Sequence, residues 1–237
     1  MDNEPGPSSN ESVDVGRLRK KAVLLLVFSV TLLASMFCIP AGTLWYWEAW
    51  TLIGTLVLPA TGVFVYLLKK DPELLARRLK TKEKEKEQKS LMKYSVWFFF
   101  LAFLLPGFDK RFGWSEVPWW LALFADVLVF LGYLLFFYVI RENRYASRVV
   151  EVEKEQTVID TGPYSIVRHP MYVSNLLIYS LAPLALGSFW AVPVAAGGIL
   201  FILARRIRNE EHVLMRDLSG YREYMARTRY RLIPGIW

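Results

Sequence analysis

Long apolar runs alternate with short charged blocks along most of the chain. A helix needs about 20 mainly apolar residues to cross a bilayer, and candidate runs occur at 22–39, 44–68, 94–108, 118–140 and 172–207. The last run contains Pro183, Gly187 and Pro193, which predict two antiparallel helices with a turn near 186–189. The pattern predicts an all-α fold, a polytopic integral membrane bundle of about six spans, or five if the last hairpin is re-entrant.

The polar stretch at residues 1–16 is rich in Ser, Asn, Pro and Gly. It cannot bury enough apolar area to offset the entropy lost on ordering, so we predict a disordered tail. We expect the run that follows to be a retained anchor and not a cleaved signal peptide, because the leader is acidic and polar. Residues 17–237 are predicted to form one membrane domain, with the N-terminal spans in 17–140 and the candidate chemistry in 141–237.

The basic residues lie in blocks between the apolar runs. The formal net charge is +7, but it forms no continuous basic face, which argues against a nucleic-acid partner. The positive-inside rule places the N-terminus, the 69–93 loop, the 141–168 segment and the C-terminal tail in the cytoplasm. Hydrophobic residues make up 54% of the chain, so we predict that its outer surface contacts the lipid bilayer.

Few residues are suited to metal binding or disulfide formation. Cys38 is the only cysteine, so no intramolecular disulfide is possible. The two histidines, His169 and His212, come without a His/Cys cluster, so we expect no metal centre. Asp126 is the one acidic residue far inside an apolar run, and we predict that it lines the interior or makes a structural hydrogen bond.

The candidate chemistry begins between the fourth and fifth predicted spans, where residues 162–172 read Gly-Pro-Tyr-x-x-x-Arg-His-Pro-x-Tyr. Pro170 disfavours the α-helical conformation at His169 and suits the first helical position, so His169 is predicted to cap the fifth span. Free backbone N–H groups at that position would hold an anion. Arg206 and Glu210 are spaced i, i+4, which places them on one helix face. Compared with their neighbours Glu210 and Arg206, Glu211 and Arg205 fit better to an ordinary salt bridge at the membrane edge.

These motifs resemble the signature of the isoprenylcysteine carboxyl methyltransferase family and its phospholipid methyltransferase relatives. The pattern Arg206-x-x-x-Glu210-Glu211 is also similar, as are the later residues Tyr221, Tyr224, Arg231 and Pro234. The resemblance extends from residue 142 to the C-terminus, about two-fifths of the chain. It implies a methyltransferase that uses S-adenosyl-L-methionine, of the bacterial type, in the inner membrane with the active site facing the cytoplasm.

The resemblance also implies roles for individual residues. Arg206 corresponds to the arginine on the acceptor side of the cofactor and is the predicted catalytic residue. Where eukaryotic members that methylate prenylated proteins carry His, this chain has Gln156. The predicted cofactor contacts are Gln156, Thr157, Val158, Ile159, Tyr164, His169, Pro170, Met171, Tyr172 and Glu210.

The predicted reaction is methyl transfer to an amphiphilic, lipid-like acceptor, with O-methylation of a carboxylate of the isoprenylcysteine type favoured. Arg206 would orient such a carboxylate, whereas an amine or thiol would need a base such as Glu210, Glu211 or His169. One alternative is a phospholipid amine N-methyltransferase. Another is an NADPH-dependent membrane reductase of the sterol-reductase type, although no glycine-rich fingerprint supports it. The third alternative is a non-catalytic membrane protein for binding or transport.

Overall fold

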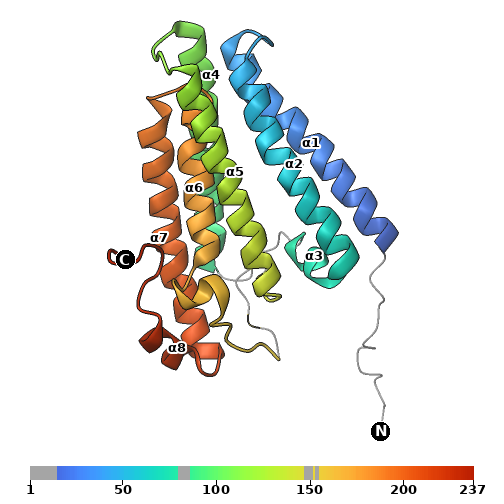
Figure 1. The fold of residues 1–237 in the computed structure, drawn as a ribbon, viewed down its shortest axis with the longest axis vertical. Coiled ribbons are helices and arrows are strands. Elements are labelled where there is room, and N and C mark those ends of the chain that lie inside the picture. Colours follow the sequence, from blue (N-terminus) through green and yellow to red (C-terminus); the bar gives the residue numbers. More distant parts are fainter. Residues whose placement is uncertain (1–14, 80–85, 147–151, 153–154) are drawn as a thin grey trace.

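The computed structural model describes residues 15–79, 86–146, 152 and 155–237. In this part of the chain all regular structure is helical (Figure 1), which confirms the predicted all-α membrane bundle. Residues 1–14 of the predicted tail and residues 80–85 of the charged loop lie outside the described residues. The elements are α1 (Val15–Ala41), α2 (Trp47–Lys70), α3 (Pro72–Arg78), α4 (Lys86–Phe112), α5 (Trp119–Glu142), the 3₁₀ helix η1 (Gly162–Ser165), α6 (Pro170–Ala185), α7 (Ala191–Asp217) and α8 (Tyr221–Arg227).

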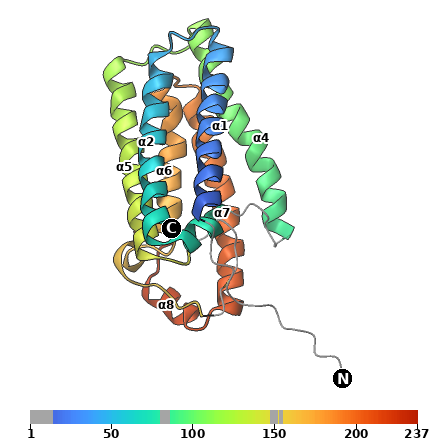
Figure 2. The same cartoon turned by 90° about the vertical axis from the view of Figure 1, so that its right-hand side faces the viewer.

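The long helices of the described residues form a closed ring. In spatial order α1 packs on α2, then α5, α6, α7 and α4 follow, and α4 returns to α1. Figures 1 and 2 show these helices running side by side along the long axis. Buried apolar side chains from all of them, such as Phe37, Leu52, Phe103, Val129, Ala182 and Ala195, share one core. Close packing of such side chains is the main attraction between helices in a bilayer.

Two glycines allow neighbouring helices to approach closely. A Cβ atom added at Gly107 of α4 would lie 2.7 Å from the carbonyl oxygen of Phe37 in α1. One added at Gly132 of α5 would lie 2.9 Å from Cγ1 of Ile178 in α6. Both helix pairs therefore depend on the absence of a side chain, as is common in membrane bundles.

The predicted hairpin in 172–207 is confirmed, since α6 ends at Ala185 and α7 begins at Ala191. The reversal occurs at Gly187, which has φ 76°. Pro183 and Pro193 do not create separate breaks. Pro193 lies in the first turn of α7, where a missing N–H costs little. Pro183 lies in the last turn of α6, which ends two residues later.

Among the described residues, α1, α2 and α5 are long and apolar enough to cross a membrane. The count of five or six spans stays a prediction. The third predicted span, 94–108, is part of a longer helix, because α4 already begins at Lys86 inside the charged segment. Lys, Glu and Gln are good helix formers, so the helix extends beyond its apolar part.

One end of the bundle carries α3, η1 and α8 (Figure 1), and the other is closed by a buried polar network. At that closed end Asp109, which is 1% exposed, accepts hydrogen bonds from the backbone N–H and hydroxyl of Ser115 at 2.7 Å. It also accepts one from the Ser188 hydroxyl. Lys110 forms an ion pair with Glu48 at 2.7 Å. These contacts hold the loops of that end together.

Candidate functional site

A cavity lies at the α8 end of the bundle, between α5, α6, α7 and α8. Its walls come from the turn after α5, the segment 156–159, η1 with the residues up to the start of α6, the second half of α7, and α8. The lining residues are Asn143, Tyr145, Ala146, Gln156, Thr157, Val158, Ile159, Tyr164, Arg168, His169, Met171, Tyr172, Arg206, Glu210, Leu214, Leu218, Tyr221 and Tyr224.

The residues predicted as catalytic or cofactor-binding lie around this one cavity. Every one of them lines it except Pro170, which is buried at the first position of α6 between His169 and Met171. Segments far apart in the sequence, at 156–172 and 206–210, are therefore brought together. Their individual roles stay predictions.

His169 occupies the N-cap position of α6, as predicted, but its backbone is not open to an anion. The N–H of His169 donates to the Arg231 carbonyl at 3.0 Å, and that of Arg168 to the Tyr230 carbonyl at 2.9 Å. Pro170 has no N–H to offer. The returning C-terminal segment thus occupies the N–H groups of Arg168 and His169, and an anion site on the first helical N–H groups after Pro170 stays a prediction.

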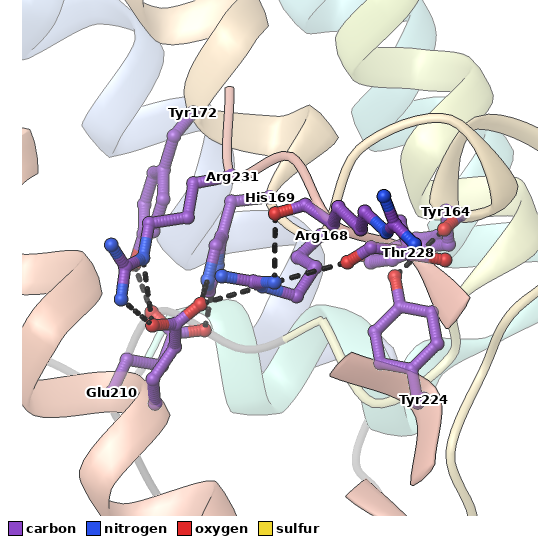
Figure 3. Close-up of polar contacts among 10 residues, drawn as sticks. Tyr164, Arg168, His169, Tyr172, Glu210, Tyr224, Thr228 and Arg231 are labelled. Atoms are coloured by element: carbon purple, nitrogen blue, oxygen red, sulfur yellow. Dashed lines mark hydrogen bonds and ion pairs between the residues drawn. The ribbon is translucent and has the colours of Figure 1, made fainter. Parts of the chain in front are cut away.

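A buried carboxylate on α7 organises the motif. Glu211, 2% exposed, accepts a hydrogen bond from Arg168 Nε at 2.7 Å and lies 2.7 Å from Nη2 of Arg231. The Nε2 atom of His169 is 3.4 Å from the same carboxylate. In Figure 3 the side chains of Arg168 and His169, from the segment before α6, lie close to that of Arg231 from the C-terminal segment. Glu211 is therefore the point at which α7, the start of α6 and the C-terminal segment meet.

The charge balance keeps Glu211 ionised. Burial by itself raises the pKa of its carboxyl group, but the contacts with His169 and the two arginines outweigh burial and lower that pKa to about 2. A buried carboxylate is tolerated when cations and hydrogen bonds compensate it. Glu211 therefore forms structural salt bridges, as expected, and its partners are Arg168 and Arg231. Arg205 lies over the Phe201 ring, 5.5 Å from its centroid.

Arg168 also attaches the C-terminal segment to the site. Its Nη1 donates to the carbonyl oxygens of Thr228 and Arg229, both at 3.0 Å. Farther along, the N–H groups of residues 231–233 point to the carbonyl of Trp237 at 3.0–3.1 Å, and the Arg231 guanidinium lies 5.5 Å from the Trp237 ring centre. The chain end is thus folded back against the start of α6.

Tyr172 joins the two predicted residues of α7. Its hydroxyl donates to Oε2 of Glu210 and accepts from Nε of Arg206 at 2.8 Å. The His169 ring stacks on the Tyr172 ring, with centroids 5.6 Å apart, and Nδ1 of His169 is 3.9 Å from Oε1 of Glu210. The side chain of Glu210 stays 25% exposed, so its carboxylate remains accessible from the cavity.

Another part of the cavity lining is aromatic and aliphatic. Tyr164 is held from two sides: Asn143 Nδ2 donates to its hydroxyl at 2.9 Å, and the Tyr224 hydroxyl donates to its carbonyl at 2.7 Å. Burial raises the pKa of Tyr164 above its usual value, so the phenol stays protonated. Leu214 and Leu218 complete this wall. A planar apolar ring fits such a surface.

Several lining residues were missed from the sequence, and one signal was available for two of them. Leu214 and Leu218 continue the four-residue spacing of Arg206 and Glu210, so they share the same stripe of α7. No comparable pattern marks Asn143, Tyr145 and Ala146. They reach the cavity only because the chain turns at the end of α5, where the N–H of Ala146 bonds the Asn143 carbonyl at 3.2 Å.

Comparison with known proteins agrees with the resemblance. Residues 120–219, from the start of α5 to just past α7, match the family model described as phospholipid methyltransferase. This family is part of the isoprenylcysteine carboxyl methyltransferase-like group, so the resemblance is confirmed for this region. Together with helices apolar enough to span a membrane, the match supports a membrane methyltransferase.

Two curated proteins are similar to part of the chain. The nickel-cobalt-cadmium resistance protein NccN of Alcaligenes xylosoxydans xylosoxydans is 33% identical over 85 residues. The cobalt-zinc-cadmium resistance protein CzcN of Cupriavidus metallidurans is 32% identical over 85 residues. In both cases the similarity covers 35% of this chain and 39% of the relative. The described residues contain no group of three or more His, Cys, Asp or Glu side chains that would hold a metal ion.

Proposed function

We propose that this chain, with its phospholipid methyltransferase family region at residues 120–219, transfers a methyl group from S-adenosyl-L-methionine to a lipid-like, membrane-accessible acceptor. The observation that carries the proposal is the meeting of Tyr172, Glu210 and Arg206 in one cavity. The anionic Glu210 and the cationic Arg206 lie side by side there, close to the aromatic part of the cavity lining. That combination suits one ligand with a cationic, hydroxyl-rich part and a second ligand with an anionic head.

Glu210 is the proposed contact for the polar part of the cofactor. Its accessible carboxylate suits the ribose hydroxyls or the ammonium group, since charge-assisted hydrogen bonds are the stronger kind. The wall of Tyr164, Leu214 and Leu218 suits the planar adenine. When bound, S-adenosyl-L-methionine supplies a methyl group on a positively charged sulfur atom. The protein's share of the work is mainly to align the acceptor with that methyl group.

Arg206 is the proposed contact for the acceptor. Its Nε is bonded to Tyr172, which fixes the plane of the guanidinium group. A carboxylate acceptor carries its own nucleophilic oxygen and needs no base, so orientation by Arg206 suffices. We therefore favour O-methylation of an amphiphilic carboxylate. The proposed location is a bacterial inner membrane, with the cavity facing the cytoplasm because of the basic blocks near the α8 end.

N-methylation of a phospholipid amine is the second candidate, and the description of the matched family favours it. The amine must lose a proton, and Glu210 and His169 are groups lining the cavity that are suited to accept it. The reductase alternative has less support, because the matched family is one of methyltransferases.

Calorimetric titration of the purified protein in detergent tests the proposal. S-adenosyl-L-methionine should bind and NADPH should not, and Glu210→Gln should weaken the binding that is seen. Binding of NADPH alone would overturn the proposal in favour of a reductase.

Transfer of a radiolabelled methyl group then identifies the acceptor class. Long-chain carboxylates and aminophospholipids are supplied in mixed micelles, and the labelled product is treated with mild alkali. A methyl ester releases labelled methanol, whereas an N-methyl product keeps its label. An alkali-stable product would overturn O-methylation of a carboxylate and support N-methylation of an amine.

A further inference from the structure

Arg78, the last residue of α3, reaches from the N-terminal helices to a wall of the cavity. Its Nη1 donates to the carbonyl oxygen of Ala146 at 2.6 Å, across 68 residues of sequence. Its guanidinium group also lies over the Phe136 ring, 4.9 Å from the centroid. Ala146 lines the cavity. A residue outside the family-matched region 120–219 therefore supports the cavity wall directly.

The turn held by Arg78 positions further side chains of the cavity. Within it, the N–H of Tyr145 donates to Oδ1 of Asn143 at 2.9 Å, and Nδ2 of Asn143 donates to the Tyr164 hydroxyl at 2.9 Å. The charge of Arg78 also acts on Tyr164, whose pKa it lowers against the larger effect of burial. A shift of this turn would displace Asn143, Tyr145 and Tyr164 together, and all three line the cavity.

The short helix α3 is well anchored, so Arg78 projects from a fixed base. Asp71 precedes Pro72 and accepts the N–H of Leu74 at 2.9 Å, the capping contact expected at a helix start. Leu74 and Leu75 are 1% and 4% exposed, and they belong to the same apolar cluster as Ile140 of α5. The contact from Arg78 to Ala146 thus joins two parts of the chain whose neighbouring side chains share one apolar cluster.

We propose that Arg78 is a positioning residue for the cofactor: by holding the Ala146 carbonyl it keeps the 143–146 wall in the geometry that binds S-adenosyl-L-methionine. This inference rests on the proposed function. It makes α3, an element of the N-terminal half, part of the cofactor site. A residue that only stabilised α3 would change the stability of the protein and leave the affinity of the folded protein for cofactor unchanged.

The test compares dissociation constants for S-adenosyl-L-methionine, measured by calorimetry on the full chain in detergent. Arg78→Met keeps an unbranched apolar side chain and removes the charge and the donors. We expect it to weaken binding about tenfold, in keeping with the loss of one charge-assisted hydrogen bond. Arg78→Lys keeps the charge and a donor and should recover part of the affinity.

Lys21→Met is the matched control. The Nζ atom of Lys21 donates to the carbonyl of Leu79, the residue after α3, at 3.4 Å, and Lys21 does not line the cavity. This variant removes a basic side chain from the same neighbourhood and should bind S-adenosyl-L-methionine like the wild type.

The fitted stoichiometry and the melting temperature separate the two possible roles. Loss of folded protein lowers the number of binding sites, whereas loss of positioning raises the dissociation constant of the sites that remain. Wild-type affinity in Arg78→Met overturns the inference. If Arg78→Met is not recovered folded, Arg78→Gln is measured in its place and decides by the same comparison. A wild-type protein that does not bind S-adenosyl-L-methionine overturns the proposed function and this inference together, while normal wild-type binding with unaffected variants overturns this inference alone.

Discussion

The Nε atom of Arg206 donates a hydrogen bond to the hydroxyl of Tyr172 at 2.8 Å. Because the same hydroxyl donates its proton to Glu210, one phenol fixes both charged residues of the α7 stripe. A phenol has one proton to give and lone pairs to accept with, so both directions are satisfied at once. The proposed acceptor and cofactor contacts are therefore mechanically linked through α6.

Removing the hydrogen bond between Tyr172 and Arg206 should lower turnover, because Arg206 is the proposed acceptor contact. In Tyr172→Phe the guanidinium loses its fixed partner, so the acceptor is held less well in line. Arg206→Ala should then cost less in the Tyr172→Phe background than in the wild type, with a coupling energy of about 1 kcal/mol. Methyl-transfer rates of the two single variants and the double variant measure it. Strictly additive effects would show that the link has no role in catalysis.

Glu210→Gln and Arg206→Ala should fail in different ways. Glu210→Gln should weaken S-adenosyl-L-methionine binding by about 1–3 kcal/mol, the range for a lost hydrogen bond to a charged group. Arg206→Ala should leave that affinity nearly unchanged and lower turnover at saturating cofactor instead. Calorimetry and rate measurements on both variants distinguish them. If Arg206→Ala abolishes cofactor binding and Glu210→Gln does not, the two assignments are reversed.

The sequence predicted much of this site because local rules govern its central parts. Pro170 determines where α6 begins, and the four-residue spacing of Arg206 and Glu210 determines which face of α7 they share. The role of Glu211 was not predictable in the same way. Adjacent carboxylates look alike in a sequence. Glu211 meets Arg168 only where α7 packs against the start of α6, and it meets Arg231 only because residues 228–237 return to that place.

Contacts of long sequence separation explain the other differences. The N–H groups of Arg168 and His169 donate to carbonyls some 60 residues farther along the chain. The contact between Arg78 and Ala146 spans 68 residues and depends on how the α1–α3 unit packs against α5. The hydrophobic periodicity of a single segment cannot indicate a contact of this kind. The length of α4 was underestimated for a different reason, since a helix of favourable residues continues past the apolar part that reveals it.

Gly132→Ala should destabilise the bundle. The added methyl group would meet Cγ1 of Ile178 at 2.9 Å, and α5 would have to move away from α6. Overpacking of this kind costs about 1–3 kcal/mol. Gly54→Ala in α2 is the matched control, because nothing lies within 4 Å of its added Cβ. Thermal unfolding in detergent should show a lower melting temperature for Gly132→Ala only.

Asp126→Asn should leave both cofactor affinity and turnover intact. Asp126 as a residue is 7% exposed. Its two carboxyl oxygens are buried and neither makes a hydrogen bond of ordinary geometry, although Thr51 and Thr55 of α2 are close by. Asp126 is 17 residues before Asn143, about 25 Å along a helix. A neutral amide is less costly to bury than a carboxylate, so the melting temperature should stay the same or rise. A drop in turnover of the folded variant would instead place Asp126 on the path of the acceptor.

Acid should destabilise the α8 end of the bundle through Glu211. Its pKa is lowered from 4.5 to about 2 in the folded protein, so the folded state binds the proton more weakly than the unfolded chain does. The stability gained from this carboxylate is fully present above pH ~4.5 and is lost as the pH falls toward ~2. A difference of this size corresponds to about 3 kcal/mol.

Glu211→Gln removes that titration and leaves Arg168 and Arg231 without their anion, a change that costs about 3–5 kcal/mol for a buried pair. The variant should therefore be less stable at pH 7 and should show a flatter stability profile between pH 5 and pH 3, since the group that binds the proton is gone. Thermal unfolding in detergent at a series of pH values, compared with Asp217→Asn as an exposed control, measures both effects. Equal slopes for the wild type and Glu211→Gln would show that Glu211 is not the group that links stability to pH.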